Sequence, residues 1–306
     1  MRDNLLAIAG SDIDYFYQIE TFLKPGDACI CTPAGKRVGG CVLNVGVVAQ
    51  AGGLNCTVLD YLKQDDEGTQ LLLETLKQKN VDVSHIQFGE DAVNGNCLIM
   101  QCGSEKCIYV INPQRPFFEV DEEMQQLLNN AEYIYSLARI LKTSFRDLQP
   151  LREARRHGAR LIFDGGCQYK EDYEREMIME LADGLFLNEE AYRRLCDAAG
   201  CQARDELLER GCEFVCITAG NRGATCYCQE GAYFQPAMKV EVTDSTGAGD
   251  SFAGCFLACR HKGMNYRDSL YYASVAGAYC CRLEGGMAGS VPFEELKKFA
   301  REHEFS

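Results

Sequence analysis

Apolar and polar residues alternate along this chain in blocks that predict strands followed by helices. Short apolar runs between turn residues are typical of buried strands, and apolar positions three or four residues apart are typical of one helix face. The expected strands are 4–10, 56–61, 133–136, 160–164, 184–187 and 213–218. The expected helices are 39–51, 68–79, 121–130, 144–157, 171–181, 189–197, 203–210, 248–262 and 266–282.

This strand–helix alternation predicts a three-layer α/β/α fold with a mostly parallel central sheet. A hairpin is expected at 224–228 and 232–235. Two other segments, at roughly 15–38 and 96–118, lack a helical period, and we expect them to form a small β lid inserted in the core. No repeat, low-complexity tract or linker divides the chain, so residues 1–306 are interpreted as a single domain.

The composition excludes two classes of partner. The 306 residues are 46% apolar and 25% charged, and the formal net charge of −14 argues against nucleic acid, because phosphate binding needs clustered Lys and Arg. Polar residues interrupt the apolar stretch 42–62, so no membrane span is expected. The apolar run 5–9 is too short for a secretory segment, and we therefore expect a cytoplasmic protein.

Cysteine is unusually frequent, with 18 residues. No Cys-x-x-Cys pair occurs, and the four histidines do not pair at helical spacing, so zinc-ribbon patterns do not fit. We interpret the cysteines as small buried apolar residues, with a redox or metal role as the alternative.

The segment 244–254, Asp-Ser-Thr-Gly-Ala-Gly-Asp-Ser-Phe-Ala-Gly, carries the clearest chemistry. A Gly-Ala-Gly run directly before an apolar helix turns backbone N–H groups toward one point at the helix N-terminus, where phosphate is attracted. Asp250 lies in the first turn of that helix. It either caps the helix or interacts with its dipole, or it takes a proton from an attacking hydroxyl, as phosphoryl transfer from ATP requires.

This segment resembles the C-terminal signature of the ribokinase-like (PfkB) carbohydrate kinase family, and other motifs follow in the family's order. Gly39-Gly40 with Asn44 resembles its sugar-binding segment, and Thr218-Ala-Gly220-Asn-Arg-Gly223 is similar to its nucleotide loop. The remaining similar stretches are Asp14, Pro25-Gly26, Asp65–Gly68, Asn188–Glu190 and Gly289–Pro292.

The resemblance implies an ATP-dependent kinase that phosphorylates a hydroxymethyl group of a sugar or sugar derivative, with Mg²⁺ on the nucleotide. Asp250 would be the general base, and the anion hole would be Gly247, Ala248 and Gly249. The implied substrate-binding residues are Asp12, Asp14, Gly40 and Asn44. The implied nucleotide-binding residues are Asn188, Thr218, Gly220, Gly223 and Ser274. Glu189 would act on Mg²⁺ indirectly, and a monovalent cation such as K⁺ would bind Asp244, Thr246 and Ser290.

Several of these residues also have a purely structural interpretation. Asp12 and Asp14 could serve a turn, Asn44 could cap a helix, and Gly220 and Gly223 could only shape a loop.

The chain departs from the family pattern in three places, one of which is Ser274, where an Asn or His often precedes the alanine-rich helix near adenine. Ala191 stands three residues after Asn188, where many members carry Glu, which leaves Glu189 or Glu190 as substitutes. Cys41 stands where the ribokinase-type motif has Lys, which weakens a ribose assignment. Outside the motifs, Arg115 is interpreted as an exposed residue, with binding of an acidic substrate group as the alternative.

Two other functions remain open. A nucleoside kinase of the same fold would need an apolar wall, for which Phe16, Phe117 and Phe118 are candidates. A non-catalytic ligand-binding relative is disfavoured by the intact Asp250 and glycine turn.

The unpaired strand edges of a lid predict a homodimer formed through the lid. Among the thiols, Cys41 and Cys255 lie in site segments, and we expect their modification to be the first to lower activity.

Overall fold

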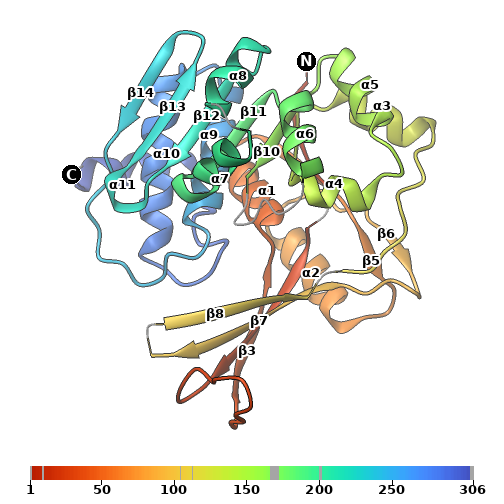
Figure 1. Ribbon diagram of the computed structural model, residues 1–306, viewed down its shortest axis with the longest axis vertical. Coiled ribbons are helices and arrows are strands. Elements are labelled where there is room, and N and C mark those ends of the chain that lie inside the picture. Colours follow the sequence, from red (N-terminus) through yellow and green to blue (C-terminus); the bar gives the residue numbers. More distant parts are fainter. Residues whose placement is uncertain are drawn as a thin grey trace.

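An eight-stranded sheet forms the centre of the computed structural model, which describes residues 2–8, 10–103, 105–111, 113–165, 172–199 and 202–303 (Figure 1). The strand order is β14-β13-β12-β11-β10-β9-β1-β4. The neighbouring strands β12, β11, β10, β9, β1 and β4 are parallel to one another. Strand β13 is antiparallel to both β12 and β14. The strands are β1 Asn4–Ile8, β4 Asn55–Leu59, β9 Tyr133–Ser136, β10 Arg160–Asp164, β11 Gly184–Asn188, β12 Phe214–Thr218, β13 Ala224–Cys228 and β14 Gly231–Gln235.

Helices cover both faces of this sheet, which confirms the predicted three-layer fold (Figure 1). One layer is α1 Cys41–Ala51, α9 Ala248–His261, α10 Tyr266–Cys281 and α11 Phe293–Glu302. The other is α3 Glu122–Asn130, α4 Ala138–Ser144, α5 Gln149–Arg156, α6 Asp172–Leu181, α7 Glu189–Ala199 and α8 Ala203–Glu209. Aromatic rings fill the space between sheet and helices, and the Phe214 and Phe256 rings lie 4.9 Å apart. The packing of α1 on α9 brings two distant segments of the chain together.

A second, four-stranded sheet in the order β3-β2-β7-β8 projects below the central sheet in Figure 1, and we call it the lid sheet. Its strands are β2 Asp12–Gln18, β3 Thr32–Gly39, β7 Gly95–Cys102 and β8 Glu105–Ile111. The antiparallel pairs β2–β3 and β7–β8 agree with the sequence prediction, whereas the parallel pairing of β2 with β7 joins them in a way that it did not foresee.

Three parts of the fold differ from the prediction. The expected helix 144–157 corresponds to α5, which begins only at Gln149, and a separate helix that was not expected, α4, ends at Ser144, before the extended backbone of Phe145. A short parallel pair, β5 Tyr61–Lys63 and β6 Gln87–Gly89, lies beside α2 Glu67–Gln78 and was not expected. Helix α11 was not expected either.

The cysteines are mostly, but not all, buried. All sixteen cysteines within the described ranges are free of disulfide bonds, and nine of them are buried. Cys29 and Cys31 are exposed in the loop between β2 and β3, so for them the prediction of a buried thiol is wrong. Among the described residues, no helix combines the length and apolar character that crossing a membrane requires.

Candidate active site

The glycine turn at the start of α9 has the geometry of an anion-binding site. Gly247 is the residue before the helix and has a φ of 77°, in the left-handed region, and a Cβ there would collide with the carbonyl oxygen of Gly286. Apart from the backbone of α9 itself, no described residue lies within 4 Å of the position that a Cβ on Gly249 would occupy. The first backbone N–H groups of a helix have no intrahelical partner, so they can donate to a ligand that approaches over Gly249.

Asp250, in the first turn of α9, is held by a residue from another helix. Its Oδ2 accepts a hydrogen bond of 2.6 Å from Nδ2 of Asn44 on α1. The residues that precede α1 and α9, Gly40 and Gly247, provide no side-chain cap, so neither Asn44 nor Asp250 is a helix cap. Asp250 does lie in the first turn of α9, where a carboxylate interacts favourably with the helix dipole. Asn44 is only 5% exposed, and its Oδ1 is buried without a partner among the described residues. This oxygen is therefore available to a ligand hydroxyl.

The pKa of Asp250 is raised from 3.8 to about 7, mainly by burial and further by the negative charges of Asp164 and Asp14, while the Asn44 hydrogen bond lowers it. Asp164 ends β10, and its Oδ2 accepts a hydrogen bond of 2.7 Å from the Tyr135 hydroxyl. Sequence reasoning missed both Asp164 and Tyr135. The signal that could have identified Asp164 is its place at the carboxyl end of a parallel strand, where ligands bind in such sheets.

Asp12 and Asp14 lie on strand β2, not in a turn, so the turn interpretation is wrong. Burial, and next the charge of Asp14, raises the pKa of Asp12 to about 6, whereas Arg115 and Arg139 lower it. Burial also raises the pKa of Asp14. The two carboxylates thus occupy a confined region where β1 passes into the lid sheet.

Gly40 is the point where β3 of the lid sheet passes into α1. Its φ is 104°, and a Cβ would collide with the carbonyl oxygen of Gly10, which follows β1. This close approach of two backbones requires glycine and sets Asn44, one turn further along α1, against Asp250.

Arg115 is buried, which corrects its interpretation as an exposed residue. It forms an ion pair with Asp60, and the two side chains are 6% and 0% exposed. The Asp60 carboxylate also accepts hydrogen bonds from the backbone N–H groups of Ser11, at 3.2 Å, and Tyr61, at 2.7 Å. Because its carboxylate partner is inside the protein, we interpret Arg115 as a residue that stabilises the junction between the core and the lid sheet.

The predicted nucleotide-binding residues lie at the ends of neighbouring strands. Asn188 ends β11 and Thr218 ends β12, and the two are paired in register. Gly220 and Gly223 follow in the next loop with φ values of 57° and 112°. Ser274 lies on α10, which packs against β13 and β14, and its Oγ is buried without a partner among the described residues. The structure thus places these residues beside the sheet half that carries β11 to β14.

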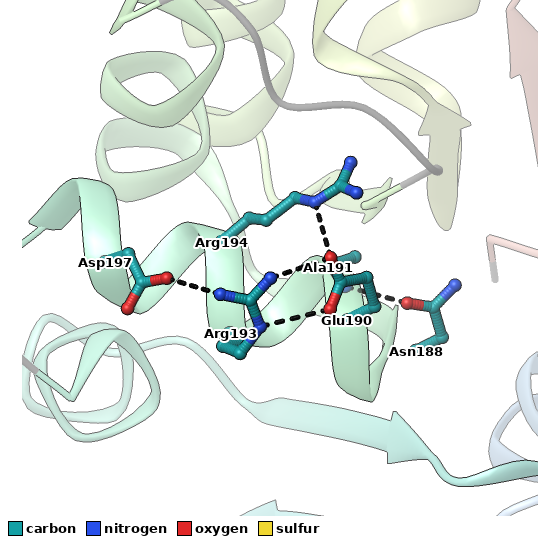
Figure 2. A network of polar contacts seen from close by, with 6 residues as sticks. All are labelled: Asn188, Glu190, Ala191, Arg193, Arg194 and Asp197. Carbon is teal, nitrogen blue, oxygen red and sulfur yellow. Dashed lines mark hydrogen bonds and ion pairs between the residues drawn. The ribbon is translucent and has the colours of Figure 1, made fainter.

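The two glutamates that could substitute at Ala191 are both held by arginines. Figure 2 shows Glu190 accepting hydrogen bonds from Arg193 and Arg194 along α7, at distances between 2.8 and 3.1 Å. Glu189 forms an ion pair with Arg222. The Asn188 side chain accepts from the backbone N–H of Ala191 at 2.7 Å and so fixes the start of α7 (Figure 2).

The three residues predicted to hold a monovalent cation are in contact with other groups. Asp244 Oδ1 accepts from the backbone N–H of Thr246 at 3.0 Å and from its hydroxyl at 2.6 Å. The Ser290 hydroxyl accepts from Lys79 Nζ at 2.9 Å. In the part of the chain that is described, no three His, Cys, Asp or Glu side chains are grouped as metal ligands.

Neither site cysteine is poised for reaction. Burial, with the negative charges of Asp164 and Asp250, raises the pKa of Cys41 well above its ordinary value. Cys255 is buried, and a hydrogen bond with Cys259 and burial raise its pKa as well. Because the thiolate is the reactive form, these thiols are poor targets for modification. That their modification is the first to lower activity stays a prediction.

Comparisons with known proteins agree with this architecture. The model of the pfkB family carbohydrate kinases matches residues 3–293. The chain is 26% identical over 287 residues to an aminoimidazole riboside kinase from Salmonella typhimurium, covering 88% of this chain and 89% of that protein. The structure of Arabidopsis thaliana ribokinase complexed with ribose and ATP matches with a TM-score of 0.83 at 18% identity, covering 98% of this chain and 99% of the other. That of Burkholderia thailandensis nucleoside kinase in complex with inosine matches with a TM-score of 0.76 at 19% identity, covering 97% and 98%. The family match spans nearly the whole chain, so the chain belongs to the pfkB family of carbohydrate kinases.

Proposed function

We propose that this protein transfers the γ-phosphoryl group of ATP to a hydroxymethyl group of a sugar or sugar derivative, with Asp250 as the general base. The observation that carries the proposal is the 2.6 Å hydrogen bond that holds Asp250 beside the glycine turn of α9. A base and an anion-binding turn on the same helix end are what an attack by an alcohol on a phosphoryl group needs.

The environment of Asp250 suits proton removal. A pKa of about 7, raised by burial and by Asp164, makes this carboxylate a stronger base than an ordinary aspartate while leaving it largely ionised above neutral pH. The unpartnered oxygen of Asn44 would accept a hydrogen bond from a substrate hydroxyl. Asp12 and Asp14 would accept from further hydroxyl groups of a polyol.

The backbone N–H groups of the turn Gly247, Ala248 and Gly249 would stabilise the negative charge that develops on the phosphoryl oxygens. Fixed backbone donors at a helix N-terminus stabilise such charge without reorganisation. The open space over Gly249 leaves room for the phosphoryl group.

Mg²⁺ would neutralise charge on the ATP phosphates when bound. The described residues offer no ready cage of three ligands, so we propose that phosphates and water supply most of its ligands, as this ion prefers. Glu189 would act only through water, since its carboxylate pairs with Arg222. The adenosine end would lie along Asn188, Thr218 and the loop that follows β12.

A nucleoside kinase is the second candidate, and the names of the riboside and nucleoside kinases among the relatives favour it. The apolar wall that it needs is smaller than expected. Phe118 is buried against Phe145, with ring centroids 5.5 Å apart, which leaves Phe117, 40% exposed, and Phe16 beneath the guanidinium of Arg37. A non-catalytic relative would have no need for an aspartate with a raised pKa, which argues against that alternative.

Unpaired thiols throughout the described chain suit a reducing compartment, and we propose that the enzyme acts in the cytoplasm.

The proposal predicts a specific pH effect of Asn44→Leu. Asn44 donates the hydrogen bond that lowers the pKa of Asp250. Without it, the acid limb of the pH profile of kcat/KM should move to higher pH by about one unit. The profile is measured between pH 5 and 9, with Asn129→Leu on α3 as a control that leaves the limb in place. An unshifted acid limb in Asn44→Leu would argue against Asp250 as the group that titrates.

The lid sheet also supports a prediction about assembly. Strand β8 is an edge strand, and its residues Ile108, Tyr109, Val110 and Ile111 are between 44% and 58% exposed. We expect two lid sheets to pair in a homodimer, because an apolar unpaired edge favours association. Sedimentation at about 10 µM should give twice the chain mass, and Tyr109→Glu should give the chain mass. A wild-type protein that sediments as a monomer would count against this assembly.

The substrate class is tested by screening ADP formation over sugars, sugar acids, amino-sugars and nucleosides. Turnover with sugars and none with nucleosides would support the first candidate. The reverse pattern would support the second, and ADP formation with neither would contradict both.

A further inference from the structure

A lysine of the lid sheet reaches the segment that precedes the glycine turn. Lys106 lies on β8, and its Nζ is 3.3 Å from Oδ1 of Asp244 and also contacts the Thr246 hydroxyl. This contact joins residues 138 positions apart in the sequence. The Lys106 and Asp244 side chains are 33% and 24% exposed, so water reaches the pair only in part.

Asp244 connects the two loops that build the turn. Its Oδ1 accepts from Thr246 twice, and its Oδ2 accepts from the backbone N–H of Gly285 at 3.2 Å. Gly286, the next residue, packs so tightly that side chains there or at Gly247 would collide with neighbouring groups. A change at the Asp244 carboxylate therefore reaches the anion-binding turn through direct contacts.

We propose that the Lys106 ammonium is a tethered cation at Asp244, which positions the glycine turn in place of a free monovalent cation. The two oxygens that such an ion would need from Asp244 and Thr246 already face an ammonium group. The catalytic consequence of this positioning role rests on the function proposed above.

Two further contacts fit this assignment. Arg37, on β3 of the same lid sheet, forms an ion pair of 2.8 Å with Glu284, directly before Gly285. Lys79 donates to Ser290, the third residue of the predicted cation set. The lid sheet thus contacts both loops at Asp244, and ammonium groups face each predicted cation ligand.

The test that needs no substrate is thermal unfolding in choline chloride against KCl at equal ionic strength. We expect Lys106→Met to bind K⁺ at the vacated carboxylate and to melt about 2–3 °C higher in KCl. Wild type and Lys36→Met, a control that removes the exposed lid pair with Glu67, should melt within about 1 °C in the two salts. A KCl-dependent shift in wild type, or none in Lys106→Met, overturns the proposal.

The second readout is turnover on the alcohol found in the screen. In choline chloride, Lys106→Met should lose about 10- to 100-fold in kcat, the usual effect of losing a charge-assisted hydrogen bond, and KCl or ammonium chloride should restore it. Wild-type turnover that depends on K⁺, or a variant with full turnover in choline chloride, overturns the proposal. Retained turnover in Asp250→Asn would refute the proposed base instead, and the melting comparison would still decide the role of Lys106.

Discussion

Asp250→Asn is expected to lower kcat by about 10²- to 10⁴-fold, the usual contribution of a general base, and to leave the fold intact. The amide has nearly the shape of the carboxylate but cannot take a proton from the attacking hydroxyl. Initial rates of ADP formation at saturating substrate measure the loss, and the KM for ATP should stay within a few-fold. Unchanged turnover would contradict the mechanism.

The same variant has an expected signature in stability. Because the pKa of Asp250 is raised from 3.8 to about 7 in the folded protein, the folded state holds this proton more tightly than the unfolded chain. The resulting stabilisation is fully present below about pH 4 and is lost as the pH rises through 7. Asp250→Asn should therefore be more stable than wild type at pH 8, by on the order of 2 kcal/mol, with no gain at pH 4.

Asp244→Asn is the matched control, because the pH dependence of its effect on stability should have the opposite sign. Burial raises the pKa of Asp244, but hydrogen bonds from Thr246 and Gly285 and the charge of Lys106 outweigh it and lower the pKa to about 2. Its contribution to stability is present above about pH 4 and is lost as the pH falls toward 2, so its replacement should destabilise at pH 8. If both variants shift stability at pH 8 in the same direction, the assignment of opposite environments is wrong.

Arg115→Met is expected to lower the free energy of unfolding by about 3–5 kcal/mol, because it leaves the Asp60 carboxylate buried without its cation. The two backbone N–H groups that donate to Asp60 remain, but they carry no full charge. Urea unfolding monitored by circular dichroism measures the loss.

Two further variants separate this effect from a general loss of lid charge. Lys36→Met breaks an exposed pair and should cost less than about 1 kcal/mol. The double variant Arg115→Met with Asp60→Asn should lose less free energy of unfolding than the sum of the two single variants, because it no longer buries an unpaired carboxylate. A loss below about 1 kcal/mol for Arg115→Met alone would contradict a buried pair.

The sequence predicted the central sheet well because its strands are short apolar runs between amphipathic helices. Strands β9 and β10 begin and end where the pattern placed them. Helix α4 was missed because most of it is buried and it has no polar cap, so its residues show little helical alternation. Helix α11 carried readable signals, with Pro292 before it and Glu294 and Glu295 in its first turn.

The candidate site was partly predictable for a similar reason. Asp250 and Asn44 lie in motifs with helical context, and the structure joins them by a hydrogen bond. Asp164 is a single aspartate at a strand end, and its proximity to Asp250 follows only from the order of strands in the sheet. The contact of Lys106 with Asp244 depends on how the β7–β8 hairpin projects from the core, which no local pattern encodes.

The most direct test is to incubate wild type and Asp250→Asn with ATP, Mg²⁺ and the alcohol found in the screen, and to identify products by mass spectrometry. Nucleotide binding is measured in parallel by calorimetry. The account predicts a phosphorylated alcohol with ADP from wild type, and only a trace from a variant that binds ATP equally well. ADP release without a phosphorylated alcohol from wild type, or equal product from both proteins, would contradict it.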